Sequence, residues 1–415
     1  MKNTRPVIAG LDIGSTKVSV VIGAPNAEGV IEVIGLGTCP NNGIRQGVVV
    51  NIEATAEAVR RARDEAELMS GHRISEVWVG VSGTHIKSFD STGMVAIKNK
   101  EVSANDVNRV IEAAKAVVVP TDRTVLHVIP REYKVDGQAG ILDPVGMNGI
   151  RLEANVHIVT GGSTAIANNL KCIDKAGLKV AGMVLDPLAA SMAVLSEDEK
   201  NLGVFVVDMG GGSCNLVYFV NGSVAYTSVV PIGGAHFTHD VAVGLRTPQL
   251  AAEELKKRFG CAMSSLVSED EIMEVEGVGG RKARMVPRRE IAEVLEPRAE
   301  ETLQLIYHDL RHSGLSGMMG SGMILTGGGS QLEGLLEMGE FIFDLPVRRG
   351  VPGKVGGLAD VIKSASHATA VGLLLYGWEQ TKHLYQMSPG DEASVSPLMK
   401  SQFTTKIKDF FSGLF

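Results

Sequence analysis

Residues 204–218, VFVVDMGGGSCNLVY, have the pattern of a buried strand, a tight glycine turn and a second strand. The apolar run 204–207 ends on Asp208, a charge that a buried strand normally excludes. The glycines at 210–212, followed by the hydroxyl of Ser213, let backbone N–H groups point together at an anion. Asp208 can hold a hydrated Mg²⁺ beside that anion. The stretch predicts a phosphate site, and the alternative is a plain β-hairpin with a glycine-rich turn.

The same plan occurs near the start of the chain, in residues 7–21, VIAGLDIGSTKVSVV. A strand ends on Asp12, a turn with a glycine and two hydroxyls follows, and Lys17 adds a cation where a phosphate would lie. Two such hairpins, far apart along the chain, indicate an internal duplication with two similar halves facing each other. We expect the two hairpins to clamp one nucleotide.

Composition places the chain among folded soluble proteins. Its 415 residues are enough for two domains, and 44% of them are apolar and 21% charged. The net charge of −7 argues against nucleic-acid binding. The four cysteines lack CxxC spacing, which argues against a zinc site and a disulfide framework and favours a reducing cytoplasm. We expect no signal peptide and no segment that spans a bilayer.

Residues 85–160 depart from a simple doubly wound α/β pattern. They contain predicted strands that include 125–129 and 132–135, and a predicted helix that Ser103 can cap. We expect a small inserted α+β unit that presents an interaction surface.

Several other features have a functional and an ordinary interpretation. A third glycine turn, 327–330, follows a short strand, at the kind of strand end where open α/β folds bind ligands. Gly233 opens a predicted helix, and helix N-termini bind phosphate. Glu253 and Lys256 can face one ligand or form an ordinary surface ion pair. The basic cluster at 281–298 can dock an acidic peptide or be a solvated face.

The last sixteen residues, KSQFTTKIKDFFSGLF, follow a polar linker and predict an amphipathic helix. Its apolar face would enter lipid while lysines contact anionic headgroups. The alternative is a helix that docks onto the body or onto a partner. The residues expected at the membrane are Lys400, Phe403, Lys406, Ile407, Lys408, Phe410, Phe411, Leu414 and Phe415.

The three glycine turns, Asp12-Ile-Gly-Ser-Thr-Lys17, Asp208-Met-Gly-Gly-Gly-Ser213 and Thr326-Gly-Gly-Gly-Ser330, resemble the phosphate-one, phosphate-two and adenosine motifs of the actin–Hsp70–sugar kinase superfamily. Within it, essentially the whole chain closely resembles the FtsA family, the bacterial actin homologues of cell division. The segments that carry this resemblance include GIRQGVVVNIEAT, GVSGTHIKS, DPVGMNGIRLE and PIGGAHFTHDVAVGL.

The resemblance implies an α/β, actin-like two-domain fold with duplicated βα cores, an inserted α+β subdomain and a C-terminal amphipathic helix. The expected parts are 1–84, 161–202 and 351–380 for the first core subdomain, 85–160 for the inserted interaction subdomain, 203–232 and 306–350 for the second core subdomain, 233–305 for a subdomain with adenosine contacts and FtsZ docking, 381–399 for a flexible linker and 400–415 for the membrane-targeting helix.

The resemblance also implies ATP with Mg²⁺ in the cleft between the domains, with Asp12 and Asp208 holding the metal through water. The residues implied to contact the nucleotide are Asp12, Gly14, Ser15, Thr16, Lys17, Asp208, Gly210, Gly211, Gly212, Ser213, Gly233, Glu253, Lys256, Gly327, Gly328, Gly329 and Ser330.

The function implied is that of a cell-division protein at the cytoplasmic face of the cell membrane. It would polymerise like actin, bind anionic lipid, and tether the tubulin-like ring protein FtsZ at the division site. The FtsZ tail would contact Arg284, Arg289 and Arg298, and later division proteins would bind the inserted subdomain.

Two departures from the superfamily motifs argue against fast ATP hydrolysis. Asn215 stands where the second phosphate motif usually continues to an Asp, and Asp186 stands where relatives commonly have a Glu before the Pro. An amide cannot act as a general base, and the shorter acid Asp186, the candidate for positioning water, reaches less far. We expect at most a slow ATPase. A sugar-kinase-like phosphotransferase is the alternative, and it would need a catalytic Asp in the insertion region. A chaperone ATPase would need an appended peptide-binding domain.

Overall fold

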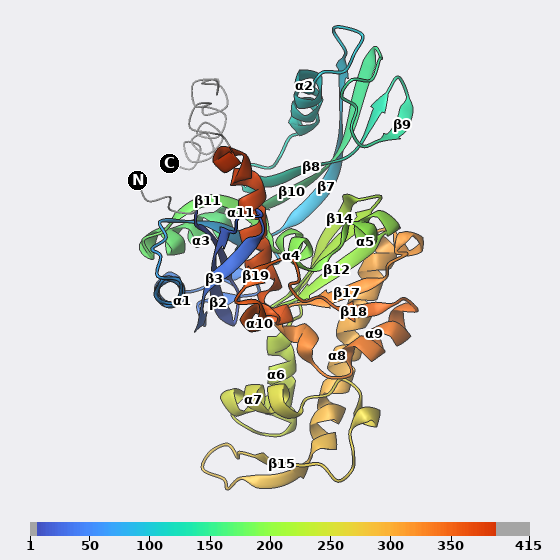
Figure 1. Ribbon diagram of the computed structural model, residues 1–415. Coiled ribbons are helices and arrows are strands. Elements are labelled where there is room, and N and C mark those ends of the chain that lie inside the picture. The colour runs from blue at the N-terminus through green and yellow to red at the C-terminus, as the bar shows by residue number, and fades with distance from the viewer. Residues whose placement is uncertain (1–5, 387–415) are drawn as a thin grey trace.

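The computed structural model describes residues 6–386 and contains two lobes, each built on one sheet (Figure 1). The first lobe has a six-stranded sheet of order β11-β6-β1-β2-β3-β19. Its strands are β1 (Ile8–Ile13), β2 (Lys17–Pro25), β3 (Ile31–Pro40), β6 (Glu76–Val81), β11 (Lys179–Leu185) and β19 (Gly356–Gly357). A short hairpin, β4 (Ile44–Arg45) and β5 (Val48–Val49), precedes α1 (Ile52–Ser70), which packs beside α3 (Ser163–Lys175).

The second lobe has a five-stranded sheet of order β14-β13-β12-β17-β18. Its strands are β12 (Val204–Met209), β13 (Cys214–Val220), β14 (Ser223–Val230), β17 (Met323–Thr326) and β18 (Val347–Arg349). In both sheets, two antiparallel hairpin pairings are followed by two parallel pairings, so β3-β2-β1-β6-β11 matches β14-β13-β12-β17-β18. The predicted duplication of the α/β core is therefore confirmed.

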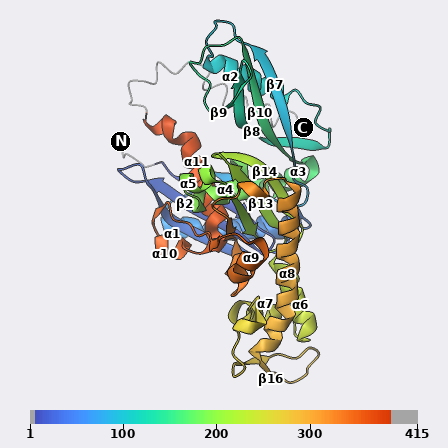
Figure 2. The same cartoon turned by 90° about the vertical axis from the view of Figure 1, so that its right-hand side faces the viewer.

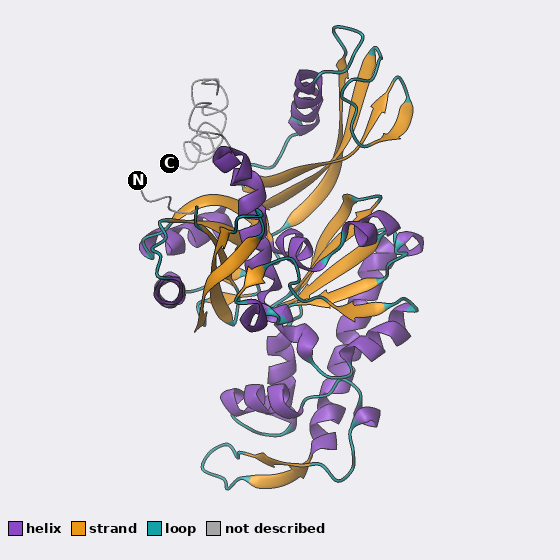
Figure 3. Cartoon of the chain, viewed as in Figure 1, coloured by secondary structure: helices purple, strands orange, loops and turns teal. Residues whose placement is uncertain are grey.

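Some helices of the second lobe extend it away from the sheet. The helices that do so are α6 (Gly234–Gly244), α7 (Gln249–Phe259) and α8 (Arg288–His312), with the strands β15 (Ile272–Val275) and β16 (Arg284–Pro287) at the far end. The helices α5 (Glu197–Leu202) and α9 (Leu335–Phe343) instead contact the strands β13 and β18 of the sheet. Figure 2 shows α8 running along this lobe, and Figure 3 shows that the part below the sheet is mostly helical. Short 3₁₀ turns are η1 (Ser264–Leu266), η2 (Ser316–Met318), η3 (Gly328–Gln331) and η4 (Ala365–His367).

Two helices lie between the sheets and join the lobes. They are α4 (Asp186–Val194) and α11 (Ala368–Gln386), and α10 (Ala359–Ile362) precedes α11. One buried cluster contains Val21 of β2, Val371 of α11 and Val206 of β12. The two lobes therefore share an apolar core where they meet.

The inserted unit, which we define as residues 87–162, stands above both lobes (Figure 1). Its antiparallel sheet has the order β7-β10-β8-β9, with α2 packed on it. The elements are β7 (Lys87–Ala96), α2 (Ala104–Lys115), β8 (Arg123–Val135), β9 (Gln138–Ile141) and β10 (Arg151–Gly162). Ser103 caps α2 in a capping box with Asp106, as predicted. The two strands expected at 125–129 and 132–135 are one strand, because the register shift opposite Asn155 and Val156 accommodates Pro130.

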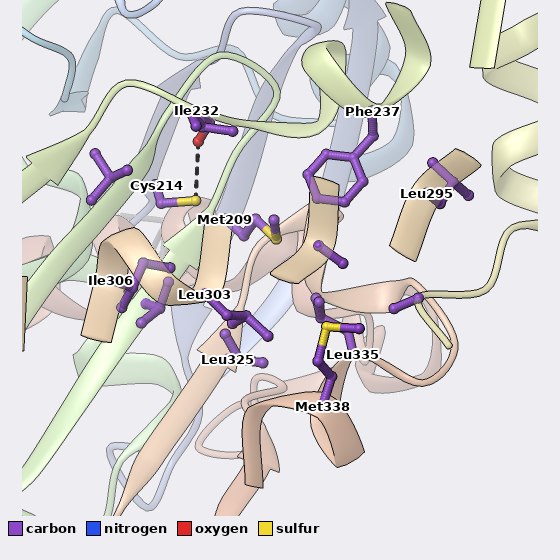
Figure 4. Packing of buried hydrophobic residues seen from close by; sticks show 14 of the residues in the cluster. Met209, Cys214, Ile232, Phe237, Leu295, Leu303, Ile306, Leu325, Leu335 and Met338 are labelled. Atoms are coloured by element: carbon purple, nitrogen blue, oxygen red, sulfur yellow. Dashed lines mark hydrogen bonds between the residues drawn. The ribbon is translucent and has the colours of Figure 1, made fainter. Parts of the chain in front are cut away.

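The core of the second lobe lies beneath its hairpin. Leu303 and Ile306 of α8 pack with Met209 and Leu325 of the sheet (Figure 4). The Cys214 thiol lies 3.1 Å from the carbonyl oxygen of Ile232, and this contact ties β13 to the segment that leads into α6. All four cysteines of the chain are buried free thiols.

The predicted membrane helix over 400–415 lies outside the described residues. Among residues 6–386, no helix is both long enough and apolar enough to cross a membrane.

Candidate functional site

The two glycine hairpins meet at the interface of the lobes. A Cβ atom built on Gly211 would lie 2.4 Å from Cγ2 of Thr16, and one built on Gly212 would lie 2.7 Å from Oγ of Ser15. Distances this short do not occur between real side chains. The glycines of the second hairpin therefore allow its turn to contact the first hairpin directly.

A cavity of about 90 Å³ lies where the hairpins converge. Its lining comes from both hairpins, the residue that follows β6, the first residue of α4, the third glycine turn, η4 and the start of α11. The lining residues are Asp12, Gly14, Ser15, Thr16, Lys17, Ser82, Asp186, Asp208, Gly210, Gly211, Gly212, Ser213, Asn215, Gly327, Gly328, Ala365, Ser366 and Thr369. Most of the residues predicted to contact a nucleotide are therefore brought together, although they come from distant parts of the sequence.

Three carboxyl groups converge on this cavity. Burial raises the pKa of Asp12 to about 6 against the opposing effect of Lys17, and burial together with the charge of Asp12 raises the pKa of Asp208 to about 7. Burial and the neighbouring Asp12 also hold the pKa of Asp186 well above its usual range. Burial lowers the pKa of Lys17, while the two nearest acids oppose that shift. The site therefore stabilises added positive charge.

Two polar atoms in the cavity have unmet hydrogen-bonding capacity. Oδ1 of Asp186 and Oδ1 of Asn215 are buried and have no hydrogen-bond partner among the described residues. Oxygen atoms of carboxylates and amides are the donors that Mg²⁺ and its bound water prefer. Within residues 6–386, no three His, Cys, Asp or Glu side chains are grouped closely enough to ligate one metal ion directly. The donors therefore suit a hydrated divalent cation.

Sequence reasoning missed the residues that support these acids. The Thr369 hydroxyl donates a hydrogen bond to Oδ2 of Asp208 at 3.2 Å, and the Ser82 hydroxyl partly offsets the raised pKa of Asp186. Ala365 and Ser366 complete the lining. Thr369 offered one signal, because it is a polar residue in the first turn of an apolar helix.

Five predicted nucleotide contacts do not line the cavity. Lys256 Nζ instead contacts Glu253 Oε2 at 2.7 Å, the Thr238 hydroxyl at 2.8 Å and the carbonyl of Gly234 at 3.0 Å. These residues therefore form their own cluster at the start of α6. The remaining three are Gly233, Gly329 and Ser330.

Gly233, Gly329 and Ser330 support the turns that line the cavity. A Cβ on Gly233 would lie 2.6 Å from the backbone nitrogen of Ser213, and one on Gly329 would meet the Met209 side chain at 2.5 Å. The Ser330 hydroxyl donates to the carbonyl of Gly327 at 2.8 Å.

The N-terminus of α6 is also engaged with the second hairpin. The backbone N–H groups of Gly234 and Ala235 donate to the carbonyl oxygens of Gly210 and Gly211, at 2.9 and 2.8 Å. These two groups therefore hold the glycine turn, and the expected phosphate contact at this helix stays a prediction.

Comparisons with known proteins assign this arrangement to a family. A family model described as cell division protein FtsA matches residues 205–372, and one described as the SHS2 domain inserted in FtsA matches residues 83–160. The cell division protein FtsA of Pseudomonas aeruginosa is 44% identical over 99% of this chain and 98% of its own length. The chain belongs to the FtsA family of cell division proteins.

Solved structures place the FtsA-family chain among actin-like folds. A chain of the PilM–PilN type IV pilus biogenesis complex superposes with a TM-score of 0.65 at 19% identity, covering 90% of this chain and 99% of that one. MreB5 of Spiroplasma citri bound to ADP gives a TM-score of 0.52 at 14% identity, covering 92% and 99%. Family membership favours the cell-division interpretation over the sugar-kinase alternative.

The three arginines predicted to contact FtsZ are unequally engaged in this FtsA-family chain. Arg284 donates to the carbonyl of Leu245 at 3.0 Å. Arg289 forms exposed ion pairs with two glutamates, one of them Glu293 at 3.1 Å. Arg298 is half-buried and binds Asp240 of α6 at 2.5 Å. Arg298 therefore has a structural role as an ion-pair partner.

Proposed function

We propose that this FtsA-family protein binds ATP with Mg²⁺ between its lobes, self-associates like actin and tethers FtsZ to the inner face of the cytoplasmic membrane at the division site. One observation carries the nucleotide part of this proposal. The two duplicated hairpins bring Asp12, Asp208 and Lys17 to one cavity, where burial raises the pKa of both acids and leaves the site in need of a cation.

Different residues of the cavity would bind different parts of MgATP. Asp12 and Asp208 would hold Mg²⁺ through water, and the cation would neutralise charge on the phosphates. Thr369 fixes the orientation of the Asp208 carboxylate through its hydrogen bond. Backbone N–H groups of the glycine turns, with Lys17, would bind the phosphate oxygens. Asp186 would position water.

The size of the cavity implies that the lobes separate when a nucleotide enters. Ligand pockets usually enclose about 300–1,000 Å³. The cavity here is about 90 Å³, and the turns of the two hairpins are in direct contact. We therefore propose that this is a closed form of the cleft, which opens to admit the nucleotide.

Nucleotide binding is tested by titrating fluorescent ATP with Mg²⁺ into the full chain and into the Asp12→Asn variant. We expect saturable binding that the variant and EDTA both weaken by at least tenfold. We expect little turnover, because Asn215 offers an amide in place of a base. Turnover clearly above background and lost in Asp12→Asn would contradict the slow-hydrolysis proposal.

Membrane tethering is tested by sedimentation with vesicles that contain anionic lipid, with and without ATP. The full chain should pellet with the vesicles, and a chain that stops at Pro397 should stay in the supernatant. Equal binding by both chains would overturn the anchor. Electron microscopy of the same samples tests polymerisation, for which we expect filaments on the vesicle surface.

FtsZ docking is tested with a peptide that has the acidic C-terminal tail of FtsZ. Arg289→Glu reverses an exposed charge and should weaken peptide binding by about tenfold at low salt. Arg61→Glu is a matched control, because Arg61 forms a similar exposed ion pair with Glu57 on the first lobe. Unchanged binding in Arg289→Glu would count against this docking surface.

A further inference from the structure

The inserted unit is attached to both lobes of the cleft, in two different ways. Its chain enters from β6 and leaves directly into α3, since β10 ends at Gly162 and α3 begins at Ser163. It is therefore continuous with the first lobe. Its strands β7, β8 and β10 also lie beside β14 of the second lobe, and Figures 1 and 2 show β14 directly below them.

A hydrogen bond at the base of β8 fixes the unit to the first lobe. The backbone N–H of Leu185 donates to Nε2 of His127 at 3.0 Å. Burial lowers the pKa of His127 to about 4, so its ring is neutral near pH 7 and Nε2 can accept this bond. Leu185 immediately precedes Asp186, which lines the cavity. This contact and the covalent connections move with the first lobe.

Thr227 of β14 makes the corresponding contact on the second lobe. Its hydroxyl lies 3.0 Å from Nε2 of His157, and Nδ1 of His157 lies 2.8 Å from Oδ1 of Asp90. The Ser88 hydroxyl donates to the carbonyl of Thr227 at 2.9 Å. His157 is 1% exposed and Thr227 is 5% exposed. We call the hydrogen bonds of Ser88 and His157 to Thr227 the Thr227 latch.

The latch lies close to the nucleotide cleft along the sheet. Thr227 pairs with Val217 on β13, two residues from Asn215, which lines the cavity. When the lobes separate, the inserted unit cannot follow both of them. It is continuous with the first lobe but joined to β14 of the second through side chains. The contacts that break are therefore those with β14, which are the latch and the packing of Val229 against the cluster that contains Val159.

We propose that the Thr227 latch couples opening of the cleft to the orientation of the inserted unit. This inference rests on the proposed function for its ligand, since the cleft is the proposed MgATP site. With the latch formed, the inserted unit holds the lobes closed. With the latch broken, the unit turns with the first lobe and the cleft admits the nucleotide. Because coupling between binding free energies is reciprocal, a protein that binds the inserted unit in its latched orientation weakens nucleotide binding.

Thr227→Val is the test variant, because valine keeps the β-branched shape and removes the hydroxyl. Ser88→Ala is a second, independent variant. Thr92→Val is the matched control, since the Thr92 hydroxyl bonds Asn155 within the inserted sheet. One hydrogen bond changes the balance of open and closed forms by roughly 2- to 10-fold. We expect each latch variant, but not the control, to accelerate association of fluorescent ATP with Mg²⁺ by that factor.

A measurement without nucleotide separates this inference from the proposed function. Spin labels at Lys98→Cys on the inserted unit and Gln304→Cys on α8 report the distance between the unit and the second lobe, while the four native cysteines are buried. In the ligand-free latch variants, the distance distribution should broaden toward longer values. Distributions equal to those of the parent would overturn the latch, whatever the affinity for ATP. A parent that binds no ATP would overturn the proposed function and, with it, the assignment of the ligand, while the distances would still report the latch.

Discussion

Asp208→Asn should stabilise the ligand-free protein at neutral and alkaline pH. Asp208 is 7% exposed at the end of β12, and its pKa of about 7 compares with an ordinary value of 3.8. The cause is first burial and then the charge of Asp12. The difference between these two pKa values corresponds to about 4 kcal/mol of unfolding free energy.

The sign of this effect follows from which state ionises first. Below pH 3.8 the Asp208 carboxyl is mostly protonated in both the folded and the unfolded chain, so it adds no pH dependence to the free energy of unfolding. Between pH 3.8 and 7 the unfolded chain ionises first, so the stability of the parent falls as the pH rises. Above pH 7 Asp208 is ionised in both states, and its ionisation lowers the stability of the parent no further. Asparagine stays neutral throughout and can still accept the hydrogen bond of Thr369.

The assay is urea denaturation of the ligand-free chain in EDTA at pH 4, 6 and 8. We expect the variant to match the parent near pH 4 and to exceed it by up to about 4 kcal/mol at pH 8. The same variant should lose MgATP binding, because the proposed Mg²⁺ site loses one of its two carboxylates. Asp143→Asn, at an exposed position of the inserted unit, is the control and should change little. A gain that is equal at all three pH values, or no gain at pH 8, would refute the reasoning.

Three further substitutions, and Gly317→Ala as a control, test the packing and capping of the fold by thermal or urea unfolding. Gly372→Ala should destabilise by about 3 kcal/mol, at the upper end of the usual cost of overpacking, because its Cβ would lie 1.8 Å from the carbonyl oxygen of Ala189 where α4 and α11 cross. Gly317→Ala, where an added Cβ meets no described atom within 4 Å, should be nearly neutral. Leu325→Ala should cost about 2–5 kcal/mol, since the side chain is fully buried in the core of the second lobe. Ser103→Ala should cost about 1 kcal/mol through loss of the capping box of α2, and an effect below 0.3 kcal/mol would contradict it.

The sequence predicted the cleft well because its determinants are local. A strand, an acid, a glycine turn and a second strand are all adjacent in the chain, so both hairpins could be recognised from residues 7–21 and 204–218. A helix start with a strong local signal was also predicted, namely the Ser103 cap of α2. The duplication of these signals indicated two halves that face each other.

The rest depended on contacts between distant segments. Thr369 reaches Asp208 only because α11 packs between the sheets, and no pattern around either residue predicts that meeting. Glu253 and Lys256 form an ion pair with each other, which is the ordinary meaning of their helical spacing. Arg298 could not be assigned to Asp240 without knowing that α6 and α8 pack together.

Coverage of β14 by the inserted unit has a consequence for solubility. β14 is the edge strand of the second sheet, and an open edge is a template for pairing with another chain. The Ser88 hydroxyl donates a hydrogen bond to the carbonyl oxygen of Thr227. Val229 packs against a small apolar cluster that includes Val159 of β10. A chain trimmed of residues 87–162 would expose this edge with its valines. The insertion thus shields the sheet from edge-to-edge aggregation, and the two lobes expressed without it should be recovered in the insoluble fraction.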